Sequence, residues 1–289
     1  MASVGRWLAR ILMGLIGIVA VAGIAIYAMS ERYLTRTYPV RTVAITRPTD
    51  SVSLARGAHL ARISCFGCHG DSLQGKVFFD VPMVGRIVAP NALERLTGYS
   101  DPQLAGLIRY GVRPDGTSPV IMPPKGMYHM SDADLAAIIA YLRTLPTVPT
   151  PKDLPRSSYG PVGRLGLITG QFGTATNAID TTVARIGADT ASAGSRAGEY
   201  LANMICTSCH GTNLTGDPAT PSPSIVNAAG YTLPELTTLF RTSTPRNSAT
   251  KLTLMAVIAR TDLKYLTDDE IAAIHGYLTT LPASGVPHK

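Results

Sequence analysis

Residues 65–69 read Cys-Phe-Gly-Cys-His, and residues 206–210 read Cys-Thr-Ser-Cys-His. The two pentapeptides use all four cysteines of the 289-residue chain. In Cys-x-x-Cys-His segments the two thiols bond to the vinyl groups of a haem, and the adjoining imidazole binds its iron. The sequence therefore predicts two covalently bound haem c groups. Their attachment residues are Cys65, Cys68 and His69, and Cys206, Cys209 and His210.

The four cysteines allow three other interpretations. Two Cys-x-x-Cys pairs could share a zinc ion, close two short disulfides, or form a thioredoxin-like redox motif. A zinc site gives no reason for a histidine directly after both second cysteines. A redox motif would need a βαβ pattern around it, and none is visible in the sequence. Haem attachment is the interpretation that accounts for all ten residues.

The surroundings of the two motifs are also repeated. A glycine stands eight residues before each first cysteine, at Gly57 and at Gly198. The segments 130–146 and 266–282 agree at nine of 17 positions, and each reads as a helix that begins after a Ser or Thr cap and ends at a proline. Such self-similarity indicates a duplicated domain.

These patterns predict an all-α fold of two tandem domains behind an N-terminal membrane helix. Helices are expected over residues 52–64, 101–110 and 132–145 of the first domain. We expect an ordered strap between the domains, because its length of about 40 residues exceeds that of a simple connection. The expected boundaries are 1–30 for the anchor, 31–46 for a spacer, 47–148 for domain one, 149–188 for the linker and 189–285 for domain two.

The anchor is predicted from an uncharged apolar stretch of 19 residues, Ile11–Met29. At 1.5 Å per residue it spans the ~30 Å hydrocarbon core of a bilayer. A cleaved signal peptide is the alternative, since Ala28-Met29-Ser30 resembles a cleavage site. Because c-type haems are attached on the outer side of energy-transducing membranes, we expect a bacterial inner-membrane protein. Its N-terminus would be cytoplasmic and its haem domains periplasmic.

The charge of the chain argues against a nucleic-acid partner. The formal net charge is +7. Counting Lys and Arg against Asp and Glu, residues 1–46 carry +4, whereas residues 189–285 carry −2. The excess lies at the membrane end and in the linker instead of on one globular face.

A sixth ligand is expected for each iron, and a methionine thioether is a common one in electron-transfer haems. In domain one, Met122 stands in a proline-rich loop and is preferred over Met83, Met127 and Met130. His59 and His129 are the other candidates. In domain two, Met255 is preferred over Met204, which precedes Cys206 by two residues, and over His275 on the closing helix.

Each half resembles a class I cytochrome c domain, with a helix, Cys-x-x-Cys-His-Gly, a distal methionine and a closing helix. The first half is similar to haem domains of the cytochrome subunits of membrane-bound alcohol and sugar-acid dehydrogenases. It shares with them Pro90-Asn91, Ile108-Arg-Tyr-Gly-Val112, Asp115-Gly116 and Met122-Pro123. The second half departs from the pattern, with Met255-Ala256 in place of Met-Pro. Those subunits carry three haems, so that particular partner is not implied.

The resemblance implies axial ligand pairs of His69 with Met122 and of His210 with Met255. It also implies that the Pro90 carbonyl orients His69 through the ring N–H. Arg109 would contact a haem propionate. These roles follow from the resemblance alone.

The expected function is electron transfer, without enzymatic activity and without a small-molecule substrate. Two six-coordinate irons leave no position for a substrate. The partners would be the membrane and redox proteins of a respiratory or photosynthetic chain, or a larger complex of which the chain is a subunit. A dihaem peroxidase with one open haem and a gas or redox sensor are the alternatives from other classes.

Overall fold

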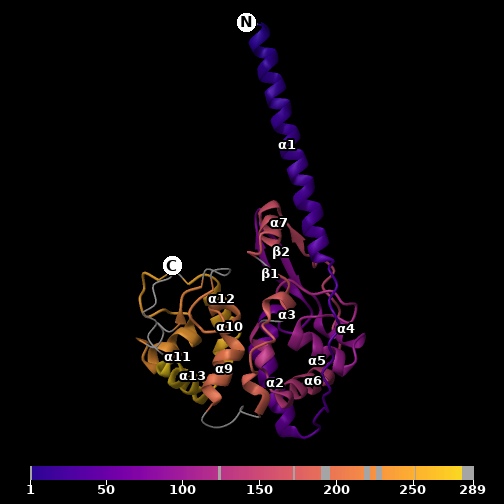
Figure 1. Ribbon diagram of the computed structural model, residues 1–289. Helices are drawn as coiled ribbons and strands as arrows, with labels where there is room; N and C mark the ends of the chain where they lie inside the picture. The colour runs from indigo at the N-terminus through magenta and orange to yellow at the C-terminus, as the bar shows by residue number, and fades with distance from the viewer. Residues whose placement is uncertain are drawn as a thin grey trace.

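A computed structural model of the chain describes residues 2–122, 125–171, 173–189, 196–217, 222–225, 230–250 and 252–281. The motif residues Pro123 and Pro282 therefore lie outside the described residues. The described chain is mainly helical, as expected, with one small sheet. One long helix projects from a globular part that has two halves (Figure 1).

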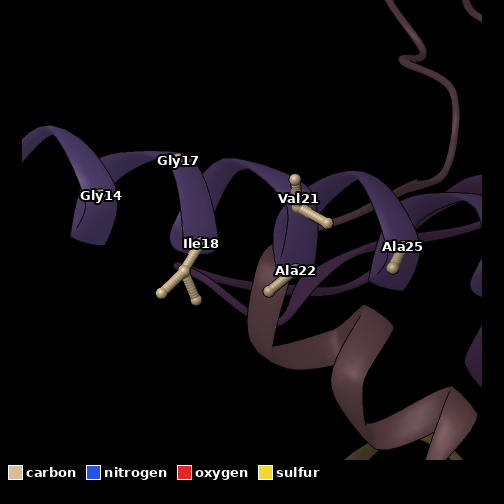
Figure 2. A pocket seen from close by; sticks show the side chains of 6 residues that line it. All are labelled: Gly14, Gly17, Ile18, Val21, Ala22 and Ala25. Atoms are coloured by element: carbon tan, nitrogen blue, oxygen red, sulfur yellow. The ribbon is translucent and has the colours of Figure 1, made fainter.

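The long helix is α1, Ala2–Leu34. Its segment Val4–Leu34 is long and apolar enough to cross a membrane, and none of its most apolar window is buried inside the molecule. A signal sequence near an N-terminus has the same composition. Small side chains leave a shallow hollow along this helix (Figure 2). The hollow is lined by Gly14, Gly17, Ile18, Val21, Ala22 and Ala25.

The first half begins with α2, Ser51–Ser64, which confirms the helix expected there. Asp50 caps it by accepting a hydrogen bond from the Ser53 N–H. The closing helix α6, Asp132–Thr144, packs against α2, and Ser131 caps it through the Asp134 N–H. The other elements of this half are α3 (Phe66–His69), β1 (Lys76–Val81), β2 (Gly85–Ala89), α4 (Ala92–Thr97), α5 (Asp101–Tyr110) and the 3-10 helix η1 (Lys125–His129).

The sheet was not expected from the sequence. Strands β1 and β2 form an antiparallel hairpin with Lys76 opposite Ala89 and Val81 opposite Gly85. The third strand, β3 (Ser158–Tyr159), comes from the linker and pairs with β2, so that the order is β1-β2-β3. Residues Val81–Gly85 form the tip of the hairpin.

The first part of the linker consequently belongs to the first half and is more than a strap. After β3 it forms α7 (Pro161–Ile168), which packs against α1. The short helices α8 (Ala175–Ala178) and η2 (Ile186–Asp189) follow. Phe172, one of the linker's apolar residues, lies outside the described residues.

The second half repeats the first around a similar helix pair. Its first helix α9 (Ala197–Ile205) packs against its closing helix α13 (Asp268–Thr280), as α2 packs against α6. The other described helices are α10 (Thr207–His210), α11 (Leu233–Thr242), α12 (Leu254–Thr261) and the 3-10 helix η4 (Leu263–Tyr265).

The two halves are joined by a continuous apolar core. Buried side chains of both halves form one cluster, and η1 packs against α9. The Tyr200 side chain of the second half is fully buried, and its hydroxyl donates to Asp134 of the first at 2.8 Å. Duplication thus produced two similar units that share their interior.

Candidate haem-attachment sites

The first attachment turn is a single helical turn placed directly after α2. The amide nitrogens of Cys68 and His69 both donate to the Cys65 carbonyl, at 3.3 and 3.0 Å. Residues three and four positions apart lie on the same side of a helix. The turn therefore presents Cys65, Cys68 and His69 on one side. It ends at Gly70, whose φ of +90° is in the region that favours glycine.

The imidazole of His69 is held from behind by a backbone carbonyl. Its Nδ1 lies 2.8 Å from the Pro90 oxygen, the pair expected from the resemblance. A carbonyl can only accept, so Nδ1 carries the proton and Nε2 is left with a free lone pair. Burial lowers the pKa of His69, although the hydrogen bond to Pro90 opposes this. A neutral imidazole with Nε2 free is the form that binds a metal.

A cavity of about 440 Å³ opens beside this turn. Such a volume is typical of a pocket for a cofactor or small molecule. Cys65, Cys68 and His69 line it together with Met122. Its walls are mostly apolar and come from several elements, the hairpin and the linker included. Examples are Phe78 and Ile87 of the hairpin, Leu104 and Leu107 of α5, and Tyr159 of β3.

Met122 is the methionine of the first half that the cavity brings together with His69. Met127 and Met130 are buried in the core and are not among the described residues that line the cavity, and Met83 is exposed at the hairpin tip. The alternative histidines are engaged elsewhere. His59 contacts Glu270 at 2.8 Å, and the His129 Nδ1 accepts from the Ile186 N–H.

Arg109 is not among the described residues that line the cavity, and its expected contact with a propionate stays a prediction. Its side chain is 1% exposed, donates to the Met130 carbonyl at 3.0 Å and pairs with Asp132 at 2.8 Å. It thus lies on the face of α5 turned away from Leu104 and Leu107. Arg95 and Arg113 line the cavity instead, and sequence reasoning missed both.

The second attachment turn reproduces the backbone of the first. The Cys209 and His210 amides donate to the Cys206 carbonyl, and the Gly216 N–H donates to the His210 carbonyl as that of Gly75 does to His69. The His210 Nδ1 lies 2.8 Å from the Pro223 oxygen. Pro223 was missed because it follows its histidine by 13 residues, whereas Pro90 follows by 21.

The described residues show less of the second site than of the first. Met255 lies partly buried in the first turn of α12, on a helix instead of the loop that was expected. Met204 is fully buried in α9, and His275 is 2.7 Å from the Tyr231 carbonyl. Residues 218–221 and 226–229, which adjoin Pro223, lie outside the described residues.

The two attachment turns lie near the boundary between the halves (Figure 1), and each receives a charged group from the opposite half. Asp262 of the second half is 7% exposed, and its carboxylate lies directly against Gly67 of the first turn. Burial raises the pKa of Asp262, although hydrogen bonds from Thr261 and Gly67 and the charges of Lys76 and Arg62 oppose this. Lys125 of the first half pairs with Asp217 at 2.5 Å. The Lys125 charge lowers the pKa of the Cys209 thiol, and the Asp217 charge raises it.

The thiols themselves are not activated. Burial raises the pKa of Cys65 to about 11 and those of Cys68 and Cys206 to about 12. A redox-active Cys-x-x-Cys pair has the opposite property, a lowered thiol pKa. All four cysteines are free thiols in the structure. Among the described residues, no three side chains of the metal-binding types come together as a zinc site would require.

The residues of the first cavity fit a covalently bound haem. Two neutral thiols flank an imidazole whose Nε2 is free, a thioether sulfur lines the same cavity, and the walls are apolar. Arg95 and Arg113 provide positive charge for acidic substituents. The second turn supplies equivalent groups, namely two thiols and an imidazole oriented by a backbone carbonyl.

One family model matches the chain, that of cytochrome c, over residues 54–146 and 195–282. These two segments contain both attachment turns and both closing helices, and together they cover more than half of the chain. No curated protein matches the chain.

Proposed function

The chain belongs to the cytochrome c family, and we propose that it is a dihaem electron carrier anchored in a membrane. Haem c supplies a reversible one-electron couple when it is bound. The family membership supports haem-based electron transfer as such. We further propose that the chain carries two haems, and we propose its redox partners and its cellular location below.

The observation that carries the proposal is the presence of His69 and Met122 in one cavity with Cys65 and Cys68. The thiols would hold haem c, while His69 Nε2 and Met122 Sδ would bind its iron. With both axial positions filled by protein, the site would exchange electrons without binding a substrate. We accordingly propose that the chain is not an enzyme, and that it binds neither a small-molecule substrate nor nucleic acid.

The second attachment turn supports a second haem in the same chain. His210 is oriented by Pro223 as His69 is by Pro90, and Met255 is the proposed sixth ligand. The Cys209 thiol lies near enough to contribute to the raised pKa of the Cys68 thiol. Such proximity would let an electron pass between the two sites within one molecule.

The last turns of α1 pack against the globular part of the molecule, which supports a retained anchor over a cleaved signal peptide. Ser30 is fully buried, and its hydroxyl accepts from Arg164 at 2.7 Å. Arg164 also pairs with Glu31 at 2.8 Å and lies over the Tyr27 ring. Cleavage after Ala28-Met29-Ser30 would remove Tyr27 and Ser30 from this cluster.

We propose the inner membrane of a bacterium as the location, with the haem domains in the periplasm, because haem c is attached on that side. The partners would be redox proteins of a respiratory or photosynthetic chain, reached in the plane of the membrane, or the other subunits of a larger complex. A methionine ligand raises the potential of a haem, which suits an acceptor of high potential.

Carbon monoxide binding to the reduced full-length protein tests the proposal. Absorbance, quantified per haem, should show two haems per chain and little or no rapid binding at either. Prompt binding at one haem of the two would reveal an open iron and favour a dihaem peroxidase. One haem per chain would contradict the role of the second turn.

A further inference from the structure

The outer face of α7 is apolar although it lies on the surface of the globular part. Val162 and Leu165 are neighbours on this face, and they are 49% and 46% exposed. The opposite face of α7 is buried through Gly163, Gly166 and Leu167. A surface helix normally places polar residues outward, so a helix that is apolar on both faces needs a second apolar cover.

The tip of the β1–β2 hairpin extends this apolar face. Its Met83 is 62% exposed and Val81 is 39% exposed. The tip is fastened to the start of α7, because the Met83 and Val84 carbonyls accept from the Val162 and Gly160 N–H groups, both at 3.0 Å. We call the exposed residues Val81, Met83, Val162 and Leu165 the α7 patch.

The single charged residue of α7 is turned toward α1. Arg164 is bound to Ser30 and Glu31, and its guanidinium lies 4.1 Å from the centre of the Tyr27 ring. It therefore leaves the outer face of α7 uncharged. The same contacts fix α7 to the last turns of α1, and Figure 1 shows α7 at the end of the globular part from which α1 projects.

The point at which α7 contacts α1 indicates where the α7 patch lies relative to the bilayer. The uncharged stretch Ile11–Met29 is about 28 Å long at 1.5 Å per residue, close to the ~30 Å hydrocarbon thickness. When this stretch spans the bilayer, Met29 lies at the boundary and Tyr27 lies in the zone where membrane proteins concentrate aromatic residues. The residues that bind α7, from Tyr27 to Glu31, lie at this same boundary.

We propose that the α7 patch inserts into the boundary between lipid headgroups and acyl chains. This inference rests on the proposed membrane anchor and adds a second contact with the bilayer. Amphipathic segments that bind membranes enter this boundary with their apolar side chains. Contact at both α1 and the α7 patch would hold the first haem domain at one tilt, so that partners in the membrane would meet the haem sites in a constant orientation.

Site-specific photocrosslinking tests this arrangement in the full-length, haem-loaded protein. The variants Ile18→p-benzoylphenylalanine, Leu165→p-benzoylphenylalanine and Val52→p-benzoylphenylalanine are reconstituted into vesicles of phosphatidylethanolamine and phosphatidylglycerol. Val52 is the matched control, an apolar residue that is 78% exposed at the start of α2. After illumination, mass spectrometry counts lipid adducts. The haem absorbance of each variant verifies its fold, and Val162→p-benzoylphenylalanine replaces the Leu165 variant if the latter does not fold.

Lipid adducts at positions 18 and 165, with at least tenfold fewer at position 52, would support the insertion of the α7 patch. Adducts at position 18 without adducts at positions 165 and 162 would overturn it while leaving the anchor intact. A crosslink from position 165 to a second copy of the chain would overturn it in favour of self-association. The absence of lipid at position 18 would remove the anchor itself, and the inference with it.

Discussion

The carboxylate of Asp262 belongs to the second half of the molecule but lies against the attachment turn of the first. It lies directly against Gly67, and its charge raises the pKa of the Cys65 and Cys68 thiols. A Cβ on Gly67 would lie 2.1 Å from one of its oxygens, so a larger residue at position 67 would displace the Asp262 carboxylate. The second half thereby places a buried acidic group beside the first attachment turn.

We expect the substitution Asp262→Asn to raise the reduction potential of one haem, the first. A negative charge stabilises the oxidised haem, which carries one more positive charge than the reduced form, and this stabilisation is strongest where water is excluded. Asparagine keeps an acceptor for Gly67 and removes the charge. Spectroelectrochemical titration at pH 8 measures both potentials. A tenfold change in the distribution of the electron between the two haems corresponds to about 59 mV.

The matched control is Asp269→Asn, since Asp269 is an exposed carboxylate on α13. It should leave both potentials unchanged. If Asp262→Asn also leaves them unchanged, or shifts both haems equally, Asp262 does not act on the first site in the way inferred from its contacts.

Met122 is the second residue whose role can be tested alone. Met122→Leu keeps the volume of the side chain and removes the sulfur. We expect the first haem to bind carbon monoxide within the mixing time and to lose potential, because an axial thioether raises it. Absorbance after mixing measures the first effect and redox titration the second. Met83→Leu, at the exposed hairpin tip, is the control and should change neither property.

At the scale of elements, the first helix and the closing helix of each half approach one another through a glycine. A Cβ on Gly57 would lie 2.0 Å from the Ala137 carbonyl oxygen, and a Cβ on Gly198 would lie 2.0 Å from that of Ala273. This close approach explains why a glycine stands eight residues before each attachment motif. The close packing of the two helices also fixes the position of the attachment turn, which directly follows the first helix.

We therefore expect Gly198→Ala to lower the free energy of unfolding by about 1–3 kcal/mol, the usual cost of overpacking. Denaturant unfolding followed by circular dichroism measures it. The control is Gly276→Ala on α13, where nothing lies within 4 Å of the added carbon. Alanine is the better helix former, so that variant should gain up to about 1 kcal/mol. Equal effects of the two substitutions would contradict the close approach.

At the scale of the whole molecule, charged groups cross the boundary between the halves. Glu270 of α13 contacts His59 at 2.8 Å and Arg56 at 3.4 Å, both on α2. Burial by itself would raise the pKa of Glu270. The hydrogen bonds from His59 and the Thr267 N–H and the charges of His59 and Arg56 outweigh it, so the pKa lies below its ordinary value of 4.5.

The sign of the pH dependence follows from this lowered pKa. Ionised Glu270 stabilises the folded molecule fully above pH 4.5, and the contribution disappears as the pH falls through the lowered pKa. In Glu270→Gln we expect a loss on the order of 1–3 kcal/mol at neutral pH, typical of hydrogen bonds to charged groups. Glutamine can still serve the cap of α13.

Unfolding free energies measured between pH 3 and pH 7 test this. The wild-type chain should lose stability over the acidic part of that range, and Glu270→Gln should lose less, because it no longer titrates there. The exposed control Asp269→Asn should follow the wild-type profile. A Glu270→Gln profile parallel to that of the wild type would show that this contact does not contribute.

Features that depend on residues close together in the chain could be predicted from the amino-acid sequence alone. The spacing within Cys65–His69 requires a single turn, the cap at Ser131 begins the closing helix, and the repeat shows that this arrangement occurs twice. Local hydrogen bonds and helical periodicity suffice for such features. The preference for Met122 also came from the sequence, since proline restricts the loop around it.

The folded structure was needed to reveal the features that depend on residues distant in the chain. It placed Arg109 away from the cavity, brought Arg95, Arg113 and part of the linker to it, and set Asp262 against the opposite half. It also fastened α7 to the end of α1 through Arg164. No local pattern encodes these contacts, because each arises when separately formed elements pack together and bury their charged groups against partners.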